Sequence, residues 1–278
     1  MQVTERSPDR VWDEQSLANP HAAADKRQRV QRMFAAIAPS YDLNNRLHSL
    51  WMDQRWRRRA VELAELGADD RVVDVACGTG DLTLGFAHTL AAIRSWERDI
   101  RPNVGQVIGL DFTFQMLPIA KEKRTVWSAR RNEHLTTNHA PVTQWINGDA
   151  QSLPLPDASA DVVSIAFGIR NVADPAAAVR EFYRVLRPGG RLIVLEFSLP
   201  TNRVLRGLYN FYFRKILPRT ATLISGDKTG AYKYLPESVN TFITRERMMQ
   251  MMSEAGFGQV EQHPLTFGVC VCYRGVKA

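Results

Sequence analysis

Short apolar segments of strand character alternate with amphipathic helical segments along most of the chain after residue 55. The strand-like segments are 71–76, 105–111, 142–150, 160–168 and 191–197, and the helical patterns before and between them are 55–66, 81–93, 114–123 and 175–186. Strands that are apolar throughout belong to parallel sheets that helices cover on each side. We therefore expect an α/β fold with a doubly wound parallel sheet, whose ligand binds beyond the carboxyl ends of the strands.

Two residues predict where individual helices break or begin. Pro118 is expected to break the helical pattern at 114–123, because proline removes a backbone donor and clashes with the preceding turn. Asp174 is expected to cap the helix that starts at Pro175.

The loop after the first strand, in VVDVACGTGDLT, is acidic and carries paired glycines. Gly78 and Gly80 could open a dinucleotide fingerprint, but the third small residue of that motif is missing and Asp81 intrudes. A carboxylate there would repel a pyrophosphate at the helix N-terminus. S-adenosylmethionine has no phosphate, and its amino and sulfonium groups are cationic. Asp74 and Asp81 are therefore expected to favour it.

Acidic residues also end the next two strands. Asp111 in VIGLD can accept hydrogen bonds from both ribose hydroxyls. Asp149 in NGDA can accept from the adenine amino group while the amide of Ala150 faces the ring. Three acidic strand ends in order predict a site for S-adenosylmethionine. Taken singly, Asp74 or Asp81 could cap a helix, and Asp149 could be a turn residue.

The chain has 278 residues, 45% of them hydrophobic, and a formal net charge of +7. This length suits one large domain, placed at 30–278, after a polar tail at 1–29 that is expected to be frayed. No segment is apolar enough for a signal peptide or a membrane span, so we expect a cytoplasmic protein. The positive charge favours an anionic partner or surface. The three cysteines, at 77, 270 and 272, are expected to be buried thiols, and no metal site is expected.

Four segments resemble the ubiquinone and menaquinone biosynthesis C-methyltransferases, in the same order as in that family. They are YDLNNRLHS, DVACGTGDLT, FGIRNVADPAAAVREFYRVLRPGGRLIVLEFS and YKYLPESVNTF, and the resemblance runs from about Val30 to the C-terminus. It implies a mostly parallel, seven-stranded class I methyltransferase fold with an N-terminal helical flap and an inserted helical cap at about 201–235. It also implies S-adenosylmethionine as cofactor and methyl transfer to a ring carbon of a polyprenylated quinol, such as demethylmenaquinol. The choice between a naphthoquinol and a benzoquinol stays open.

The resemblance also assigns residues to the cofactor. Carried over by position they are Thr79, Asp111, Asp149 and Ala150, beside which we place Asp74, Gly78, Gly80, Asp81 and Phe112. Ala166 stands where many relatives have serine, which puts one polar cofactor contact in question. Tyr41 and Asp42 resemble the flap that would close over the cofactor, although Asp42 could instead cap a helix. Two longer connections, 94–103 and 129–141, are interpreted as surface insertions.

Methylation of a ring carbon requires an electron-rich ring, so the reduced quinol rather than the quinone must be the substrate. Arg170 in GIRN is expected to stabilise the ionised quinol hydroxyl, and Asn171 to hold the other ring oxygen. In an alternative interpretation, Arg170 is a structural partner of a carboxylate near the cofactor. No histidine falls in a site motif, so no general base is assigned.

The segment from Thr201 to Gly226 contains no acidic residue and interleaves arginines and a lysine with aromatic and aliphatic residues. Such a segment suits docking on an anionic membrane surface, which would make the protein peripheral on the inner face of the cytoplasmic membrane. The alternative is an ordinary cap helix that packs its aromatic residues on the sheet. A homodimer is left open.

The sequence argues against two other functional classes. Nucleic acid is not expected as the substrate, because base N-methylating enzymes carry Asn/Asp-Pro-Pro-aromatic after the fourth strand and this chain has AFGIRN there. A methyltransferase of another small molecule or of RNA is the alternative function. A non-catalytic binding protein is disfavoured by the intact cofactor loop.

Overall fold

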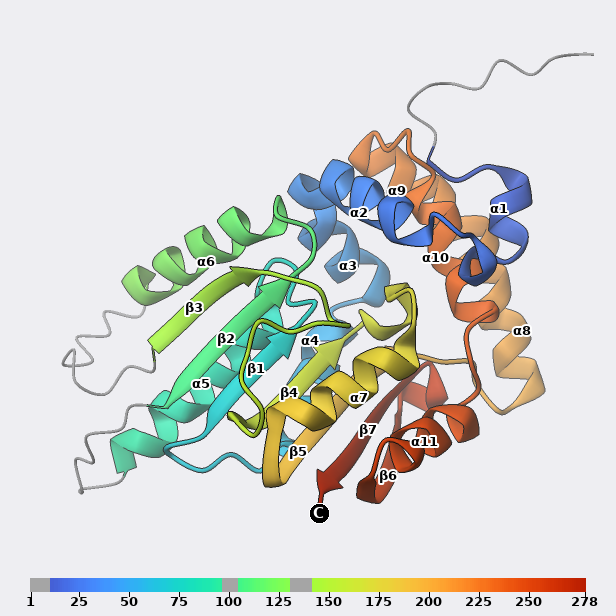
Figure 1. Cartoon of the computed structure of the whole chain (residues 1–278). Coiled ribbons are helices and arrows are strands. Elements are labelled where there is room, and N and C mark those ends of the chain that lie inside the picture. Colours follow the sequence, from blue (N-terminus) through green and yellow to red (C-terminus); the bar gives the residue numbers. More distant parts are fainter. Residues whose placement is uncertain (1–10, 97–104, 131–141) are drawn as a thin grey trace, which may run out of the picture.

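A computed structural model describes residues 11–96, 105–130 and 142–278 of the chain. These residues form a seven-stranded sheet in the order β3-β2-β1-β4-β5-β7-β6 (Figure 1). Strands β1 to β5 run parallel, whereas β7 is antiparallel to both β5 and β6. The strands are β1 (Arg71–Val75), β2 (Gln106–Asp111), β3 (Val142–Asn147), β4 (Ala160–Ala166), β5 (Leu186–Phe197), β6 (Phe257–Leu265) and β7 (Cys270–Lys277). The predicted doubly wound, mostly parallel sheet is confirmed.

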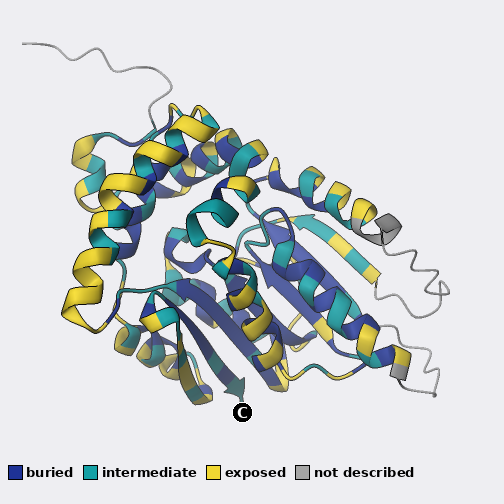
Figure 2. Cartoon of the chain, turned by 180° about the vertical axis from the view of Figure 1, so that it is seen from behind, coloured by how far each residue is buried: buried dark blue, intermediate teal, exposed yellow. Residues whose placement is uncertain are grey.

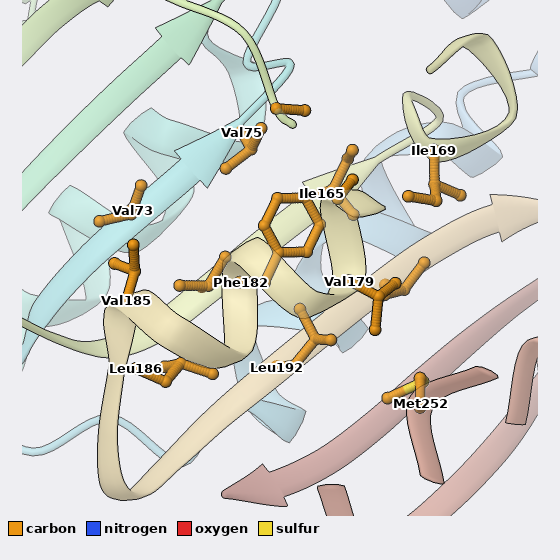
Figure 3. Packing of buried hydrophobic residues seen from close by; sticks show 14 of the residues in the cluster. Val73, Val75, Ile165, Ile169, Val179, Phe182, Val185, Leu186, Leu192 and Met252 are labelled. Atoms are coloured by element: carbon orange, nitrogen blue, oxygen red, sulfur yellow. The ribbon is translucent and has the colours of Figure 1, made fainter. Parts of the chain in front are cut away.

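Helices cover both faces of this sheet, as the alternating pattern predicts (Figure 1). The helices that flank the sheet are α4 (Met52–Leu63), α5 (Asp81–Trp96), α6 (Met116–Arg130), α7 (Pro175–Val185) and α11 (Arg245–Glu254). Because successive strand residues point to opposite faces, Val72 packs with α4 and α5 while Val73 packs with α7 and α11. Figure 3 shows the second layer, in which Phe182 of α7 lies against the strand side chains.

Two of the three cysteines lie inside this core. Cys270 and Cys272 on β7 are fully buried on the face covered by α4 and α5, and no cysteine is in a disulfide. Burial raises the pKa of the Cys272 thiol to about 12 and that of Cys77 well above its usual value. The expectation of small buried thiols is confirmed for the pair on β7, and Cys77 is partly buried.

The expectation for Pro118 was wrong. Helix α6 begins at Met116 and continues unbroken to Arg130, so Pro118 lies in its first turn. Backbone N–H groups of the first turn have no acceptor within the helix, and proline is tolerated there. Asp174 caps α7 as predicted, since its carboxylate accepts from the backbone N–H groups of Ala176 and Ala177.

The frayed tail predicted at 1–29 is wrong for residues 11–29. Trp12 is 1% exposed and stacks on Tyr234, with ring centroids 4.5 Å apart. The backbone N–H groups of residues 11 and 12 donate to the Thr229 carbonyl. Asp13 and Ser16 form a capping box that starts α1 (Glu14–Ala18). Residues 1–10 lie outside the described part of the chain.

Two helical layers lie beyond the carboxyl ends of the strands, where the predicted flap and cap are found (Figure 1). The N-terminal flap contains α1, η1 (Pro20–Ala22), α2 (Lys26–Ile37), η2 (Ala38–Ser40) and α3 (Tyr41–Ser49). The cap contains α8 (Arg203–Phe211), η4 (Tyr212–Ile216), α9 (Leu217–Ser225) and α10 (Ala231–Asn240). No helix in the described residues is both long and apolar enough to cross a bilayer. The two expected insertions fall largely outside the described residues, at 97–103 and 131–141.

We predict that the segment around Trp12 contributes to stability. Trp12→Ala should lower the free energy of unfolding by about 3 kcal/mol, because it removes a buried indole and leaves a cavity beside Tyr234. Trp12→Phe, which keeps an aromatic ring for the stack, should lower it much less. Denaturant unfolding of the three proteins measures the difference. An unchanged midpoint in Trp12→Ala would mean that this segment adds nothing to the fold.

Candidate active site

A cleft of about 790 Å³ lies at the carboxyl ends of β1, β2 and β4, beneath the flap. We call it the cofactor cleft. Of the residues predicted to bind the cofactor or substrate, those that line it are Tyr41, Gly78, Asp111, Phe112, Asp149, Ala150, Ala166 and Asn171. The structure therefore brings the ends of strands β1 to β4 together, as the order of acidic strand ends predicts.

Asp111 is the most enclosed carboxylate of the cleft. It accepts from the backbone N–H of Gly78 at 2.8 Å and from that of Thr113 at 2.7 Å. Burial raises the pKa of Asp111 to about 6, although both hydrogen bonds oppose the shift. Gly78 adopts φ of +56°, a left-handed conformation that lets the loop turn over the carboxylate.

Asp149 and Phe112 form the other end of the cleft, together with an arginine that sequence reasoning missed. The Asp149 carboxylate accepts from the backbone N–H of Gln151, so it is a turn residue as well as a cleft residue. Arg27 of α2 lies 2.8 Å from the Asp149 carboxylate and 4.5 Å above the Phe112 ring. A planar ring that replaced the guanidinium here would meet an apolar face and a carboxylate acceptor.

Asp74 does not line the cleft, so its predicted contact with the cofactor is wrong. It is 1% exposed between β1 and α5, where its carboxylate accepts from the Thr83 hydroxyl at 2.6 Å and the Ser164 hydroxyl at 2.7 Å. The side chain of a strand residue points to one face of the sheet, and that of Asp74 points toward α5.

Asp81 also faces away from the cleft, toward cations of the flap and of α6. Its carboxylate lies 3.2 Å from Arg46 and 2.6 Å from Lys123. Burial alone would raise the pKa of Asp81, but Arg57 and Lys123 lower it. The carboxylate is therefore neutralised by the protein, and the prediction that it favours a cationic ligand is wrong. As the alternative interpretation held, Asp81 lies at a helix start, in the first turn of α5.

Thr79 and Gly80 shape the loop and do not line the cleft. The Thr79 hydroxyl donates to the Asp42 carboxylate at 2.6 Å, and Lys123 bridges Asp42 and Thr79. Asp42 is thus a latch between the flap and the loop, and the interpretation as a helix cap is wrong. A Cβ at Gly80 would lie 2.7 Å from Trp145, which accounts for the glycine.

Helix α2, which belongs to the flap, lies across the mouth of the cleft and forms hydrogen bonds to both of its sides. Lys26 donates to the Val172 carbonyl at 2.6 Å on one rim, and Gln31 donates to the Phe112 carbonyl at 3.2 Å on the other. The flap therefore begins before the Tyr41 and Asp42 pair that predicted it.

The FGIRN segment forms a wall between this cleft and a second cavity. Phe167 adopts φ of +56°, which is unusual for a bulky residue and is held by surrounding contacts. Its carbonyl accepts from Arg170 at 2.7 Å and from Asn171 at 3.2 Å. A Cβ at Gly168 would lie 2.6 Å from the Ala76 side chain, so only glycine fits beside the end of β1.

Arg170 is buried, and its guanidinium is paired. Arg170 Nη1 donates to Glu196 at 2.5 Å, and the Arg170 backbone N–H donates to the same carboxylate at 3.3 Å. This is the arrangement of the alternative interpretation, a structural pair near the cofactor. Asn171 does not line the second cavity, because its amide is used by the Phe167 carbonyl and by the Tyr234 hydroxyl at 2.8 Å. Asn171 lines the cofactor cleft instead, and its predicted hold on a ring oxygen stays a prediction.

The second cavity, of about 890 Å³, lies between the flap, α4 and the cap. We call it the aromatic cavity because its lining includes Phe34, Tyr41, Trp56, Phe167, Phe197, Tyr209, Tyr212, Phe213, Tyr232 and Tyr234. The cations at its wall are Arg57 and Arg170. Phe34, Tyr41 and Phe167 line both spaces, so the aromatic cavity adjoins the cofactor cleft.

The ubiE/COQ5 methyltransferase family model matches residues 22–277. The chain belongs to this family. A demethylmenaquinone methyltransferase of Thermus thermophilus is 45% identical over 87% of the chain and 99% of its own length. One from Deinococcus radiodurans is 44% identical, over 91% and 94%. A ubiquinone/menaquinone biosynthesis C-methyltransferase of a Geobacter species is 40% identical, over 92% of the chain and all of its own length.

A solved SAM-dependent methyltransferase from Thermotoga maritima has the same fold, with a TM-score of 0.53 and 21% identity over 90% of this chain and all of its own. The family and the fold together identify the protein as an S-adenosylmethionine-dependent methyltransferase. The predicted family, fold class and cofactor are confirmed.

Several site residues escaped prediction, for different reasons. Arg27 lies within the segment 1–29 that is expected to be a tail. An isolated arginine there does not indicate that the segment folds over the cleft. Arg57 lies in a basic helix whose arginines look alike in sequence. The statement that no histidine falls in a site motif is wrong for His48, which belongs to YDLNNRLHS and lines the aromatic cavity.

Proposed function

We propose that the protein methylates a ring carbon of a polyprenylated quinol, with S-adenosylmethionine as the methyl donor. The observation that carries the proposal is an aromatic cavity that adjoins the cofactor cleft and contains two arginines. A flat, apolar ring with ionisable oxygens suits such a cavity. The names of the Thermus and Deinococcus relatives support the same class of substrate.

The cofactor cleft fits S-adenosylmethionine through its carboxylates. Asp111 uses one lone pair on each oxygen for the protein, which leaves acceptor sites for the two ribose hydroxyls. Asp149 would accept a hydrogen bond from the adenine amino group, with Phe112 and the Ala150 amide beside the ring. For this, the Arg27 guanidinium must leave the Asp149 carboxylate that it contacts in this structure. When bound, the cofactor supplies a methyl group on a cationic sulfonium. Ala166 lines this cleft and offers no side-chain hydrogen bond to it.

Arg170 and Tyr41 have distinct proposed roles. Tyr41 lines both spaces, where its ring would separate the ribose from the quinol and align the two reactants. Arg170 lines the aromatic cavity while Glu196 fixes its guanidinium, so it would orient the ring oxygen beside the target carbon. A guanidinium held in place by a carboxylate loses little conformational entropy when a ligand oxygen binds.

The cap provides a route to a substrate whose tail lies in a membrane. Helix α8 buries none of its residues, and Val204, Leu208 and Phe211 on one side of it are 72%, 64% and 62% exposed. Figure 2 shows exposed residues along the helices of the cap. Arg203 and Lys215 are exposed on the same segment. We propose that this α8 surface docks on an anionic leaflet, with the apolar side chains at the acyl boundary and the cations at the head groups.

The first test measures methyl transfer to a short-tailed demethylnaphthoquinol kept reduced, to its oxidised quinone, and to a benzoquinol. Only the reduced rings should gain the methyl group, because the quinone carbon is electrophilic. The ratio of the two quinol rates assigns the head group. Total RNA serves as the control substrate. Transfer into RNA, or equal transfer to quinone and quinol, would contradict the proposed reaction.

The second test concerns Asp111. Affinity for S-adenosylmethionine should fall by about tenfold between pH 7.5 and pH 5, because Asp111 becomes protonated through about pH 6 and loses acceptor sites. Asp111→Asn should bind about 1–3 kcal/mol more weakly at pH 7.5 and show little of this pH dependence. Calorimetry measures both, with Asp157→Asn on the exposed surface as the matched control. A mutant that keeps the wild-type affinity would remove Asp111 from the cofactor site.

The third test concerns the α8 surface. Val204→Glu with Leu208→Glu should abolish sedimentation with anionic vesicles, because it places two anions at the docking side of α8. Turnover of a short-tailed, water-soluble quinol should survive. Val126→Glu, an exposed apolar residue on α6, is the matched control. If the wild-type protein does not sediment with anionic vesicles at low salt, the docking proposal is wrong. If it forms a dimer that the double change disrupts, the α8 surface is a dimer interface instead.

A further inference from the structure

Among the described residues, the lining of the aromatic cavity contains one imidazole, that of His48 near the end of α3. Its Nδ1 lies 3.3 Å from the Tyr212 hydroxyl, which comes from the π-helical turn η4 of the cap. Its Nε2 is buried and has no hydrogen-bond partner among the described residues. A buried ring nitrogen without a partner is costly unless a ligand supplies one.

The Tyr212 hydroxyl contacts both the Nδ1 and the backbone carbonyl of His48, and its proton can go to only one of them. The Tyr212 hydroxyl donates its only proton to the His48 backbone carbonyl at 3.2 Å. With the Tyr212 proton on that carbonyl, Nδ1 is the donor to the Tyr212 oxygen. In the neutral ring Nε2 is left with a free lone pair. His48 lines the cavity that is proposed to bind a quinol, and its Nε2 is the ring nitrogen that lacks a partner there among the described residues.

We propose that His48 Nε2 is the general base that removes the proton of the quinol hydroxyl. This inference rests on the proposed quinol substrate. When the proton passes to Nε2, the O–H electron pair stays on the ring oxygen and makes the adjacent carbon nucleophilic. That carbon forms its bond to the donated methyl group as the methyl–sulfur bond breaks, and sulfur keeps the electron pair. The ring C–H proton then leaves to water while Nε2 returns its proton to the ring oxygen, so one proton is released overall.

The other ionisable groups around the cavity are poorer bases. Burial raises the pKa of Tyr41, Tyr209 and Tyr212, so these hydroxyls stay protonated at neutral pH. The Asp53 carboxylate already accepts from Ser49 and from Gln54. Burial lowers the pKa of His48, which keeps the imidazole neutral and able to accept a proton at pH 7.

The arginines of the wall assist this transfer. Arg57 and Arg170 line the same cavity, and the charge that remains after their pairing with Asp81 and Glu196 favours the ionised ring over the neutral one. The same charge disfavours a permanently charged imidazole, so His48 should become protonated only together with a phenolate. The His48 imidazole would then take a proton only when the quinol is bound, and it would remain neutral in the free protein.

Nitrogen NMR of protein labelled at histidine tests the proton position without methyl transfer. The probe is a nitrophenol with a short alkyl chain, because its hydroxyl is acidic enough to ionise beside an imidazole. The free protein should show His48 as the Nδ1–H tautomer, and the probe should convert it to imidazolium. Tyr212→Phe should mix the tautomers. A His48 signal that stays neutral with the probe bound, or an Nε2–H tautomer in the free protein, would overturn the assignment.

Kinetics provide the second arm. His48→Gln keeps a polar group near the Nε2 position but cannot take the proton, and it should lower kcat by about a hundredfold with little change in KM. The loss should shrink on a fluorinated quinol whose hydroxyl is already ionised at the assay pH. His263→Gln on strand β6 is the matched control. Equal losses on both quinols would indicate a structural role, and an unaffected kcat in His48→Gln, or a larger loss in Asp53→Asn, would reject His48 as the base.

This design separates the inference from the proposed function. If the wild-type protein methylates no quinol, the proposed function fails, and the NMR result still reports whether His48 takes a phenol proton. If the wild-type protein methylates the quinol and His48→Gln does so at the same rate, only the inference fails. Thermal melting of each variant confirms that a lost rate reflects chemistry rather than unfolding.

Discussion

The buried pair between Arg170 and Glu196 is the interaction on which the geometry of the site depends. Both side chains are almost fully buried, and removing two charges from water costs several kcal/mol per ion unless their geometry compensates. The compensation includes further hydrogen bonds, since Arg170 also donates to the Phe167 carbonyl and Glu196 accepts from two backbone N–H groups. Together they join the end of β4 to the end of β5 and hold Phe167 in its left-handed conformation. Phe167 lines both the cofactor cleft and the aromatic cavity, so this pair fixes the wall between the two spaces.

The sequence could predict those parts of the molecule that local patterns determine. Strand and helix periods indicated the parallel sheet, and the rule that ligands bind beyond parallel strands placed Asp111 and Asp149 in one cleft. Both predictions hold because a strand-end residue is carried to the site by the backbone itself. The capping of α7 by Asp174 was predictable for the same reason, since cap and helix are adjacent in sequence.

Predictions failed where a side chain has partners that are remote in sequence. Asp74 and Asp81 flank the same glycine loop, but Thr83 and Ser164 engage the first and flap cations engage the second. Trp12 looked like part of a tail because its partner, Tyr234, is near the other end of the chain. His48 lies in a motif that resembles the family, and its contact with Tyr212 of the cap comes from a residue 164 positions away.

The opposite charges of the two spaces bear on how the proposed reaction is accelerated. The cofactor cleft is lined by the carboxylates Asp111 and Asp149, and the aromatic cavity is lined by the guanidinium groups of Arg57 and Arg170. Transfer of a methyl group from a sulfonium to a phenolate destroys both charges, so an apolar surrounding favours the transition state over the separated ions. The wall of Phe34, Tyr41 and Phe167 provides such a surrounding. A free arginine beside the phenolate would work against this, because it would stabilise the ion more than the transition state. Glu196 cancels much of the charge of Arg170, which leaves a guanidinium that can orient the ring oxygen without making the ring unreactive.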